Sequence, residues 1–180
     1  MNYLDVSIFF VLNGFAHVSA AFDFIIVLLA RYLAYPATLL PFLIFLKPEW
    51  RTKRVLVDVG FIYAAAVLGR FIITPLIRAT FPVERPFEIF SEAARLIPHE
   101  ASASFPSGHA VFFFALAMGV WFIHRRLGGY MLVLAFFMGV ARIMAGVHWP
   151  ADILAGAVVG IVISLITFSI ARRFQSNAPQ

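Results

Sequence analysis

The sequence predicts an all-α protein: a polytopic bundle of helices that crosses a membrane several times. Hydrophobic residues make up 62% of the 180 residues and charged residues 13%, and the mean hydropathy is +0.92. A soluble domain of this length cannot bury so much apolar surface. Several apolar runs approach about 20 residues, the length that a helix needs to cross the hydrocarbon core. Without an internal repeat or a low-complexity stretch, residues 1–180 are predicted to form a single membrane domain.

Five apolar runs are predicted to be transmembrane helices. They cover residues 22–46, 55–77, 107–123, 130–147 and 151–170. The first apolar stretch, residues 3–18, is shorter and contains Asn13, Gly14 and His17. We expect it to form an N-terminal interfacial helix, with a sixth short span as the alternative.

The basic residues predict the orientation of these spans. Lysines and arginines gather in two connections and after the last span, at Lys47, Arg51, Lys53, Arg54, Arg125, Arg126, Arg172 and Arg173. With five spans, all three groups face one side, which the positive-inside rule makes cytoplasmic. The protein is therefore predicted in the plasma (inner) membrane, with residues 78–106 and the connection around His148 on the outer or periplasmic side. The net charge of +5 thus signals topology, and nucleic acid is not an expected partner.

Three outward segments carry most of the polar chemistry. They contain Arg78 and Arg85, then Pro106, Ser107, Gly108 and His109, then Arg142, His148 and Asp152. Each segment alone has an ordinary explanation: an interfacial arginine often anchors a helix, a serine often caps one, and an exposed histidine is often idle. Gathered on one face near lipid, three arginines, two histidines, a carboxylate and a helix start indicate a bound ligand.

The residue types predict that this ligand is a phosphate. Arginine presents a planar fork of donors to phosphate oxygens, and a helix N-terminus attracts the same charge. His148 and Asp152 are four residues apart at a helix start, so the carboxylate can accept a hydrogen bond from one ring nitrogen and leave the other free as a nucleophile. His109, on another helix, is placed to donate a proton to the leaving group.

The patterns Arg-x6-Arg-Pro, Pro-Ser-Gly-His and Arg-x5-His-x3-Asp, in this order, resemble the three signature motifs of the type-2 phosphatidic acid phosphatase superfamily. The resemblance covers residues 78–152. It implies a metal-independent reaction without a cofactor, through a phosphohistidine on His148 that Asp152 orients, with His109 acting first as acid and then as base. It also implies that the phosphate is held by Arg78, Arg85, Ser107, Gly108 and Arg142.

Two positions depart from the family pattern. Arg78 stands where the family usually has lysine, which keeps the charge but changes the geometry. Ala141 precedes Arg142 where the family usually has serine, so one possible hydroxyl contact to the phosphate is missing.

The flanking sequence is similar to that of the short bacterial undecaprenyl-diphosphatases associated with bacitracin resistance and the recycling of peptidoglycan precursors. This similarity rests on Asn13-Gly14 and on Leu96-Ile97-Pro98-His99. This similarity implies a membrane lipid phosphate as substrate, with undecaprenyl diphosphate first. Phosphatidylglycerophosphate, phosphatidic acid and lipid A remain alternative substrates, transfer to an alcohol remains an alternative outcome, and a non-enzymatic lipid-binding or transport protein remains an alternative function. The sequence makes no prediction of oligomeric state.

Other charged and aromatic residues have more than one interpretation. Arg70, Thr74 and Arg78 follow one helical face, so Arg70 either supports the site or forms a structural ion pair or snorkels, and Arg31 is likewise open. Most charged residues of the long outward loop are expected to be solvated, although a loop of this length also suits a lid or head-group selector. Trp149 is expected to anchor at the interface.

Overall fold

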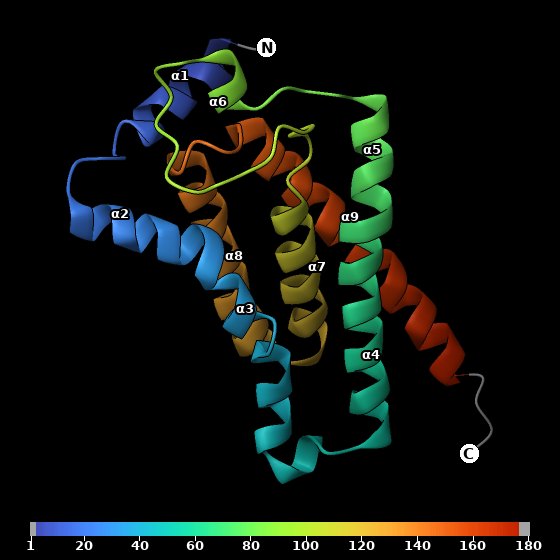
Figure 1. The fold of residues 1–180 in the computed structure, drawn as a ribbon. Coiled ribbons are helices and arrows are strands. Elements are labelled where there is room, and N and C mark those ends of the chain that lie inside the picture. The colour runs from blue at the N-terminus through green and yellow to red at the C-terminus, as the bar shows by residue number, and fades with distance from the viewer. Residues whose placement is uncertain (1–2, 177–180) are drawn as a thin grey trace.

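The computed structural model describes residues 3–176, which form helices and loops without a β-strand (Figure 1). The α-helices are α1 (Tyr3–Asn13), α2 (Ala20–Val27), α3 (Ala34–Ala37), α4 (Lys53–Leu68), α5 (Thr74–Thr80), α6 (Pro86–Ile89), α7 (Gly108–Ile123), α8 (Arg125–Met144) and α9 (Pro150–Ser176). Two π-helical turns, η1 (Leu28–Tyr32) and η4 (Gly69–Ile73), and two 3-10 segments, η2 (Leu40–Leu46) and η3 (Pro48–Trp50), join them. The predicted all-α class is confirmed.

Helix α7 forms the centre of the bundle and packs against α8, α9 and α4 (Figure 1). The close approach of α9 depends on glycine. A Cβ atom on Gly156 would lie 2.8 Å from the Ser107 carbonyl oxygen, and one on Gly160 would lie 2.4 Å from the Val111 carbonyl oxygen. Small residues of this kind allow two helix backbones to come together without an intervening side chain. As a result, the start of α7 lies directly against the start of α9.

Three of the described helices are long and apolar enough to cross a membrane: Lys53–Thr80, Arg125–Met144 and Pro150–Phe174. The first joins α4, η4 and α5 into one rod, so it corresponds to the predicted second span. Helix α7 is apolar but has 16 residues, about 24 Å at 1.5 Å per residue. The number of five spans stays a prediction.

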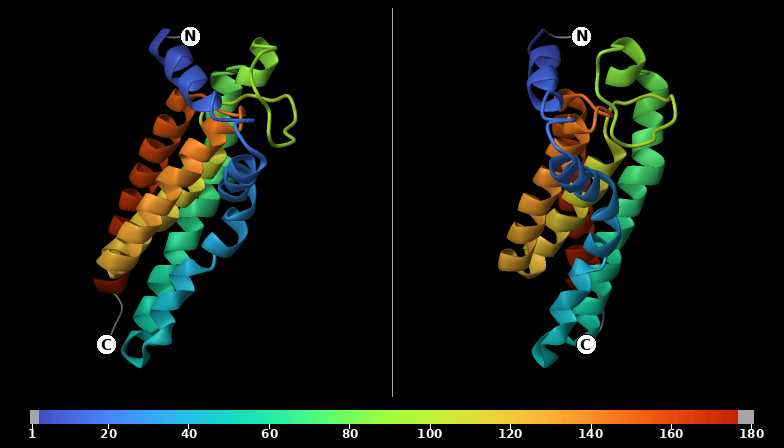
Figure 2. Two further views of the ribbon diagram at one scale, coloured as in Figure 1. Left: turned by 90° about the vertical axis from the view of Figure 1, so that its left-hand side faces the viewer. Right: turned by 60° about the vertical axis from the view of Figure 1, so that its left-hand side comes forward.

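The predicted first span is not a regular helix. Residues 22–46 are divided among α2, η1, α3 and η2, and the chain changes direction between them (Figure 2). Pro36 lies in α3, and Pro41 is the second residue of η2, after Leu40. Proline lacks the N–H group that an α-helix uses and clashes with the preceding turn. Composition alone predicted one span here because both prolines lie within an otherwise apolar run.

The two ends of the bundle differ in charge. Helices α1 and α6 and the connection between α8 and α9 lie at one end, whereas the η2–α4 and α7–α8 connections and the end of α9 lie toward the other (Figures 1 and 2). The three basic groups of the sequence therefore share one end. Helix α1 has 11 residues, about 17 Å, which is too short to cross a hydrocarbon core of about 30 Å and argues against a sixth span.

Candidate active site

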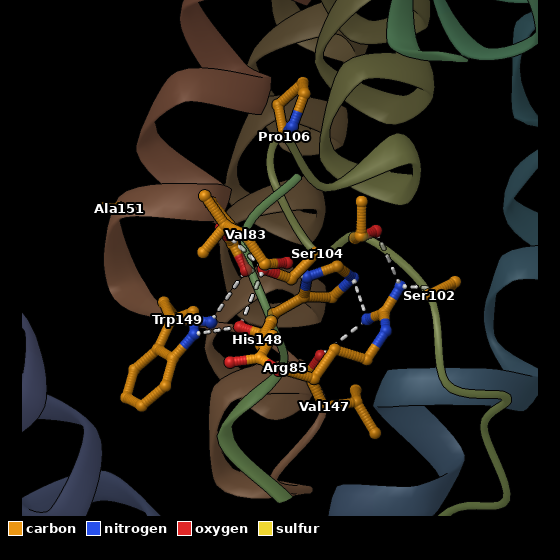
Figure 3. Close-up of polar contacts among 12 residues, drawn as sticks. Val83, Arg85, Ser102, Ser104, Pro106, Val147, His148, Trp149 and Ala151 are labelled. Carbon is orange, nitrogen blue, oxygen red and sulfur yellow. Dashed lines mark hydrogen bonds and ion pairs between the residues drawn. The ribbon is translucent and has the colours of Figure 1, made fainter. Parts of the chain in front are cut away.

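The connection between α8 and α9 holds a buried histidine–aspartate pair. His148 Nδ1 lies 3.0 Å from Asp152 Oδ2, and each side chain is 1% exposed. The same carboxylate accepts hydrogen bonds from the backbone N–H of Trp149 at 2.9 Å and from the Ser104 hydroxyl at 3.4 Å (Figure 3). The contact expected from the four-residue spacing is therefore present, and it occupies Nδ1 while Nε2 faces Arg85.

Burial, followed by the charges of Arg142 and Arg85, lowers the pKa of His148 well below its usual value of 6.5. An imidazole in this position is neutral at pH 7. A neutral ring whose Nδ1 faces a carboxylate carries its free electron pair on Nε2. This is the protonation state that a nucleophilic histidine requires.

Arg85 is held beside this ring by the long loop. Its side chain is fully buried and donates from Nη1 to the Val147 carbonyl oxygen at 2.7 Å, with His148 Nε2 at 3.5 Å (Figure 3). Nη2 donates to the Ser102 hydroxyl and the Ala103 carbonyl oxygen, both at 3.3 Å. Burial, and then the charge of Arg78, lower the pKa of Arg85 to about 10, which leaves the guanidinium charged at neutral pH.

The start of α7 presents a second group of donors. Ser107 precedes the helix, its backbone N–H donates to the Asp152 carbonyl oxygen at 3.1 Å, and Gly108 is the first helical residue. The first N–H groups of a helix have no partner within it and favour an anion. Arg78 reaches this turn from α5 and donates to the Pro106 carbonyl oxygen from Nε at 3.3 Å and Nη2 at 3.0 Å.

Three donor atoms at this site are buried without a partner. Among the side chains of residues 3–174, they are the only buried nitrogen or oxygen atoms that lack a hydrogen bond: Arg85 Nε, Ser107 Oγ and Arg142 Nε. Arg142 is 3% exposed and uses Nη1 to donate to the Ala30 carbonyl oxygen at 2.9 Å. Buried polar atoms are normally paired, and leaving one unpaired costs about 1–3 kcal/mol. All three unpaired donors belong to residues that the sequence assigns to a phosphate.

His109 lies on the first turn of α7, next to Arg70. The distance from Arg70 Nη1 to His109 Nδ1 is 3.5 Å. Arg70 thus lies beside a predicted site residue, as the interpretation that it supports the site requires. The structure brings all eight predicted site residues to one end of the bundle, and their chemical roles stay predictions.

His99 is a neighbour of the site that sequence reasoning missed. Its ring is perpendicular to that of His148, with centroids 6.3 Å apart. Burial is the largest cause that lowers the pKa of His99, to about 4. Most charged residues of the loop were expected to be solvated, and the sequence singled out His99 only as part of Leu96-Ile97-Pro98-His99, shortly before the Pro-Ser-Gly-His motif, without a role at the site.

Trp149 corrects a second expectation. It is 1% exposed and packs against Phe9 and Phe90, with ring centroids 5.0 and 6.1 Å away. Its Nε1 donates to the Glu84 carbonyl oxygen at 2.9 Å. Trp149 is therefore not an interfacial anchor: α1 and the long loop cover it, and it fixes the loop that carries Arg85.

The donor set at this end suits an anion. Among residues 3–176, no group of three or more His, Asp or Glu side chains is arranged to hold a metal ion. The cations that face the His148–Asp152 pair are arginine side chains.

Comparison with known proteins agrees with this geometry. Residues 55–176 match the PAP2 superfamily. The chain belongs to this superfamily. The matched region includes every predicted site residue, and the resemblance seen in the three motifs is confirmed.

Individual relatives extend the comparison. Undecaprenyl-diphosphatase BcrC of Bacillus subtilis is 29% identical over 93% of this chain and 83% of its own length. Bacitracin transport permease protein BcrC of Bacillus licheniformis is 40% identical over 84 residues, which make up 47% of this chain but 41% of that protein. The crystal structure of Aquifex aeolicus LpxE superimposes with a TM-score of 0.73 at 26% identity, covering 93% of this chain and 96% of that one. These similarities support a membrane-embedded phosphatase, as the sequence predicts.

Proposed function

We propose that this PAP2 protein hydrolyses the terminal phosphate of a lipid diphosphate in the plasma membrane, with undecaprenyl diphosphate as its preferred substrate. The observation that carries the proposal is the set of unpartnered buried donors, Arg85 Nε, Ser107 Oγ and Arg142 Nε, around the His148–Asp152 pair. A phosphoryl group supplies the oxygens that these donors lack.

The reaction has two steps. His148 Nε2 attacks the terminal phosphorus, a P–N bond forms, and the bond to the bridging oxygen breaks as His109 donates a proton to that oxygen. Lipid monophosphate leaves. His109 then takes a proton from water, whose oxygen attacks the phosphohistidine, so that inorganic phosphate is released and His148 is regenerated.

The arginines stabilise the charge on the transferring group. In phosphoryl transfer most of the protein's contribution is positioning and electrostatic stabilisation of the equatorial oxygens. The positive charge comes from four parts of the chain: Arg78 on α5, Arg85 in the long loop, Arg142 on α8 and the start of α7. Asp152 holds the proton on Nδ1 and stabilises the ring as it acquires positive charge.

The choice of lipid rests on similarity. A relative that aligns over 93% of this chain is an undecaprenyl-diphosphatase. Phosphatidylglycerophosphate, phosphatidic acid and lipid A are the alternative substrates, since the motif residues contact only the phosphate. The basic connections lie at the end of the bundle opposite the site, which supports an active site facing the outside or periplasm.

The test is phosphate release by the purified protein in detergent with EDTA present. Undecaprenyl diphosphate, phosphatidylglycerophosphate, phosphatidic acid and lipid A are compared at equal mole fraction. We expect the highest kcat/KM on undecaprenyl diphosphate, activity that survives EDTA, and inhibition by vanadate, which mimics the transferring group.

Three outcomes would contradict the proposal. A preference for another lipid would reassign the substrate, and loss of activity in EDTA with recovery in Mg²⁺ would refute the arginine-based mechanism. Lipid binding without phosphate release, in the wild type and in His148→Ala alike, would indicate a binding protein.

A further inference from the structure

The rod formed by α4, η4 and α5 contains a π-helical turn at Gly69–Ile73. Pro75 follows this turn, and a proline ring clashes with the carbonyl group four residues earlier, here that of Phe71 inside the turn. The Thr74 N–H bonds to the Gly69 carbonyl oxygen five residues earlier, and the Thr74 hydroxyl donates to the same oxygen at 2.9 Å. Single π turns occur often at functional sites. Here the turn contains Arg70.

The Arg70 guanidinium lies against the first turn of α7. Nη1 is 3.5 Å from His109 Nδ1, and a Cβ atom on Gly108 would lie 2.7 Å from the same Nη1. Within residues 3–176, no carboxylate lies at ion-pair distance from Arg70. A half-buried guanidinium inside an apolar bundle without a counter-ion is costly unless a ligand supplies the negative charge.

A cavity of about 260 Å³ opens beside this pair. It is lined by Arg70 and His109 and by the aromatic side chains of Tyr35, Phe71, Phe112 and Phe113. Besides this cation and this proton donor the wall is mainly apolar, and Tyr35 and Thr38 are the other lining residues with a polar group. Such a lining suits the junction between a phosphate and a hydrocarbon chain.

In the proposed reaction, the leaving group lies in this cavity. The leaving oxygen must lie at His109, which protonates it, while the terminal phosphate lies among Arg78, Arg85 and Arg142. In a lipid diphosphate, the leaving oxygen belongs to a second phosphate, which is attached to the lipid and gains negative charge as the bond breaks. Arg70 is the cation next to His109 at this position.

We propose that Arg70 binds the lipid-linked phosphate of a diphosphate substrate and is the residue that sets the preference for diphosphate over monophosphate lipids. This inference rests on the proposed function and assigns a residue outside the three motifs. A lipid monophosphate has no group to pair with Arg70, because its leaving oxygen is bonded directly to carbon.

A rival role for Arg70 predicts the opposite preference. If Arg70 only orients His109 through Nδ1, its loss weakens proton delivery to the leaving oxygen. An alkoxide leaving group needs that proton more than a phosphate does, so monophosphate hydrolysis would lose more activity than diphosphate hydrolysis.

The test compares Arg70→Gln with wild type on farnesyl diphosphate and farnesyl phosphate, which share one tail, by initial rates of phosphate release in detergent. A charge-assisted hydrogen bond contributes about 1.5–3 kcal/mol, so kcat/KM on the diphosphate should fall about 10- to 100-fold more than kcat/KM on the monophosphate. Arg70→Lys keeps the charge and should recover part of the diphosphate activity. The matched control is Arg31→Gln, an exposed arginine on η1 whose guanidinium lies 5.6 Å from the Tyr32 ring centroid, and it should leave both rates unchanged.

A second readout does not depend on turnover of the monophosphate. Methylenediphosphonate and inorganic phosphate are compared as competitive inhibitors, and Arg70→Gln should weaken the first by about 10-fold or more with little effect on the second.

Equal losses on the two substrates, or a larger loss on the monophosphate, would overturn the inference and leave the proposed function intact. If Arg70→Gln does not fold, the same comparison in Arg70→Lys decides between the two roles, because an orienting role still predicts a larger monophosphate loss. A wild-type protein that releases phosphate from neither lipid would overturn the proposed function and this inference together.

Discussion

Asn13 joins three separate parts of the chain next to the active site. Its side chain is 4% exposed. Nδ2 donates to the carbonyl oxygens of Ala94 and Met144, and Oδ1 accepts from the Ala94 N–H, all at 2.9 Å. The N-terminal helix α1 is thereby tied both to the long loop and to the end of α8.

The substitution Asn13→Ala removes all three hydrogen bonds and leaves two carbonyl groups and one N–H group, all part-buried, without their Asn13 partner. At about 1 kcal/mol of net stabilisation for each bond, the free energy of unfolding should fall by about 3 kcal/mol. For a chain of this size, that corresponds to a decrease in Tm of roughly 6–12 °C.

The loop that Asn13 holds also carries Arg85, so activity should fall as well, at temperatures where the variant remains folded. Tryptophan fluorescence during heating in one detergent measures Tm, and phosphate release measures kcat/KM. The matched control is Ser7→Ala on the same helix, which removes one hydrogen bond to the Tyr3 carbonyl oxygen at the exposed surface and should shift Tm by less than about 2 °C. If Asn13→Ala kept the Tm and kcat/KM of the wild type, the conclusion that this side chain fixes the long loop in place would be refuted.

Three further predictions concern the histidines and the orientation. His148→Ala should abolish turnover of every lipid, whereas His109→Ala should lose about 10²- to 10⁴-fold on a lipid monophosphate and less on a diphosphate, because a phosphate leaving group needs protonation less than an alkoxide; equal proportional losses would mean that His109 is not the acid. Burial lowers the pKa of His148, so below pH 6.5 the unfolded chain takes up a proton that the folded chain does not. The free energy of unfolding should therefore fall by about 1.4 kcal/mol for each pH unit below 6.5. In this range the Tm of His148→Gln should fall less steeply than that of wild type. In this cysteine-free chain, Glu92→Cys and Arg125→Cys should react with a membrane-impermeant maleimide from opposite sides of the membrane, with Glu92→Cys labelled from outside; labelling of Glu92→Cys only from the cytoplasmic side would reverse the orientation.

Local features of the site could be predicted from the sequence. The contact between His148 and Asp152 follows from their four-residue spacing across a helix start, and the position of Gly108 at the start of α7 follows from the change from polar to apolar sequence. Such contacts depend on the backbone geometry of a few neighbouring residues, which residue type and spacing largely determine. The motif order also identified the family.

The course of residues 20–46 could not be predicted in the same way. An apolar run reports that a segment avoids water, but it does not report whether the segment stays straight. Pro36 and Pro41 were visible in the sequence, yet prolines are tolerated in membrane helices where neighbouring groups satisfy the free carbonyls. In the π-helical turn before Pro36, the Ala30 carbonyl oxygen accepts a hydrogen bond from Arg142, 112 residues away, a contact that no local pattern encodes.

The sequence by itself determined the helical class, the membrane environment, the family and the chemical types gathered for a phosphate. Only the tertiary structure decided that Arg70 lies against His109, that His99 stands beside His148, and that Trp149 is buried beneath α1 instead of facing lipid. These placements join residues from different helices and loops. Neither a period nor a spacing along the chain encodes them, because they result from how closely the helices pack and where the long loop folds back between them.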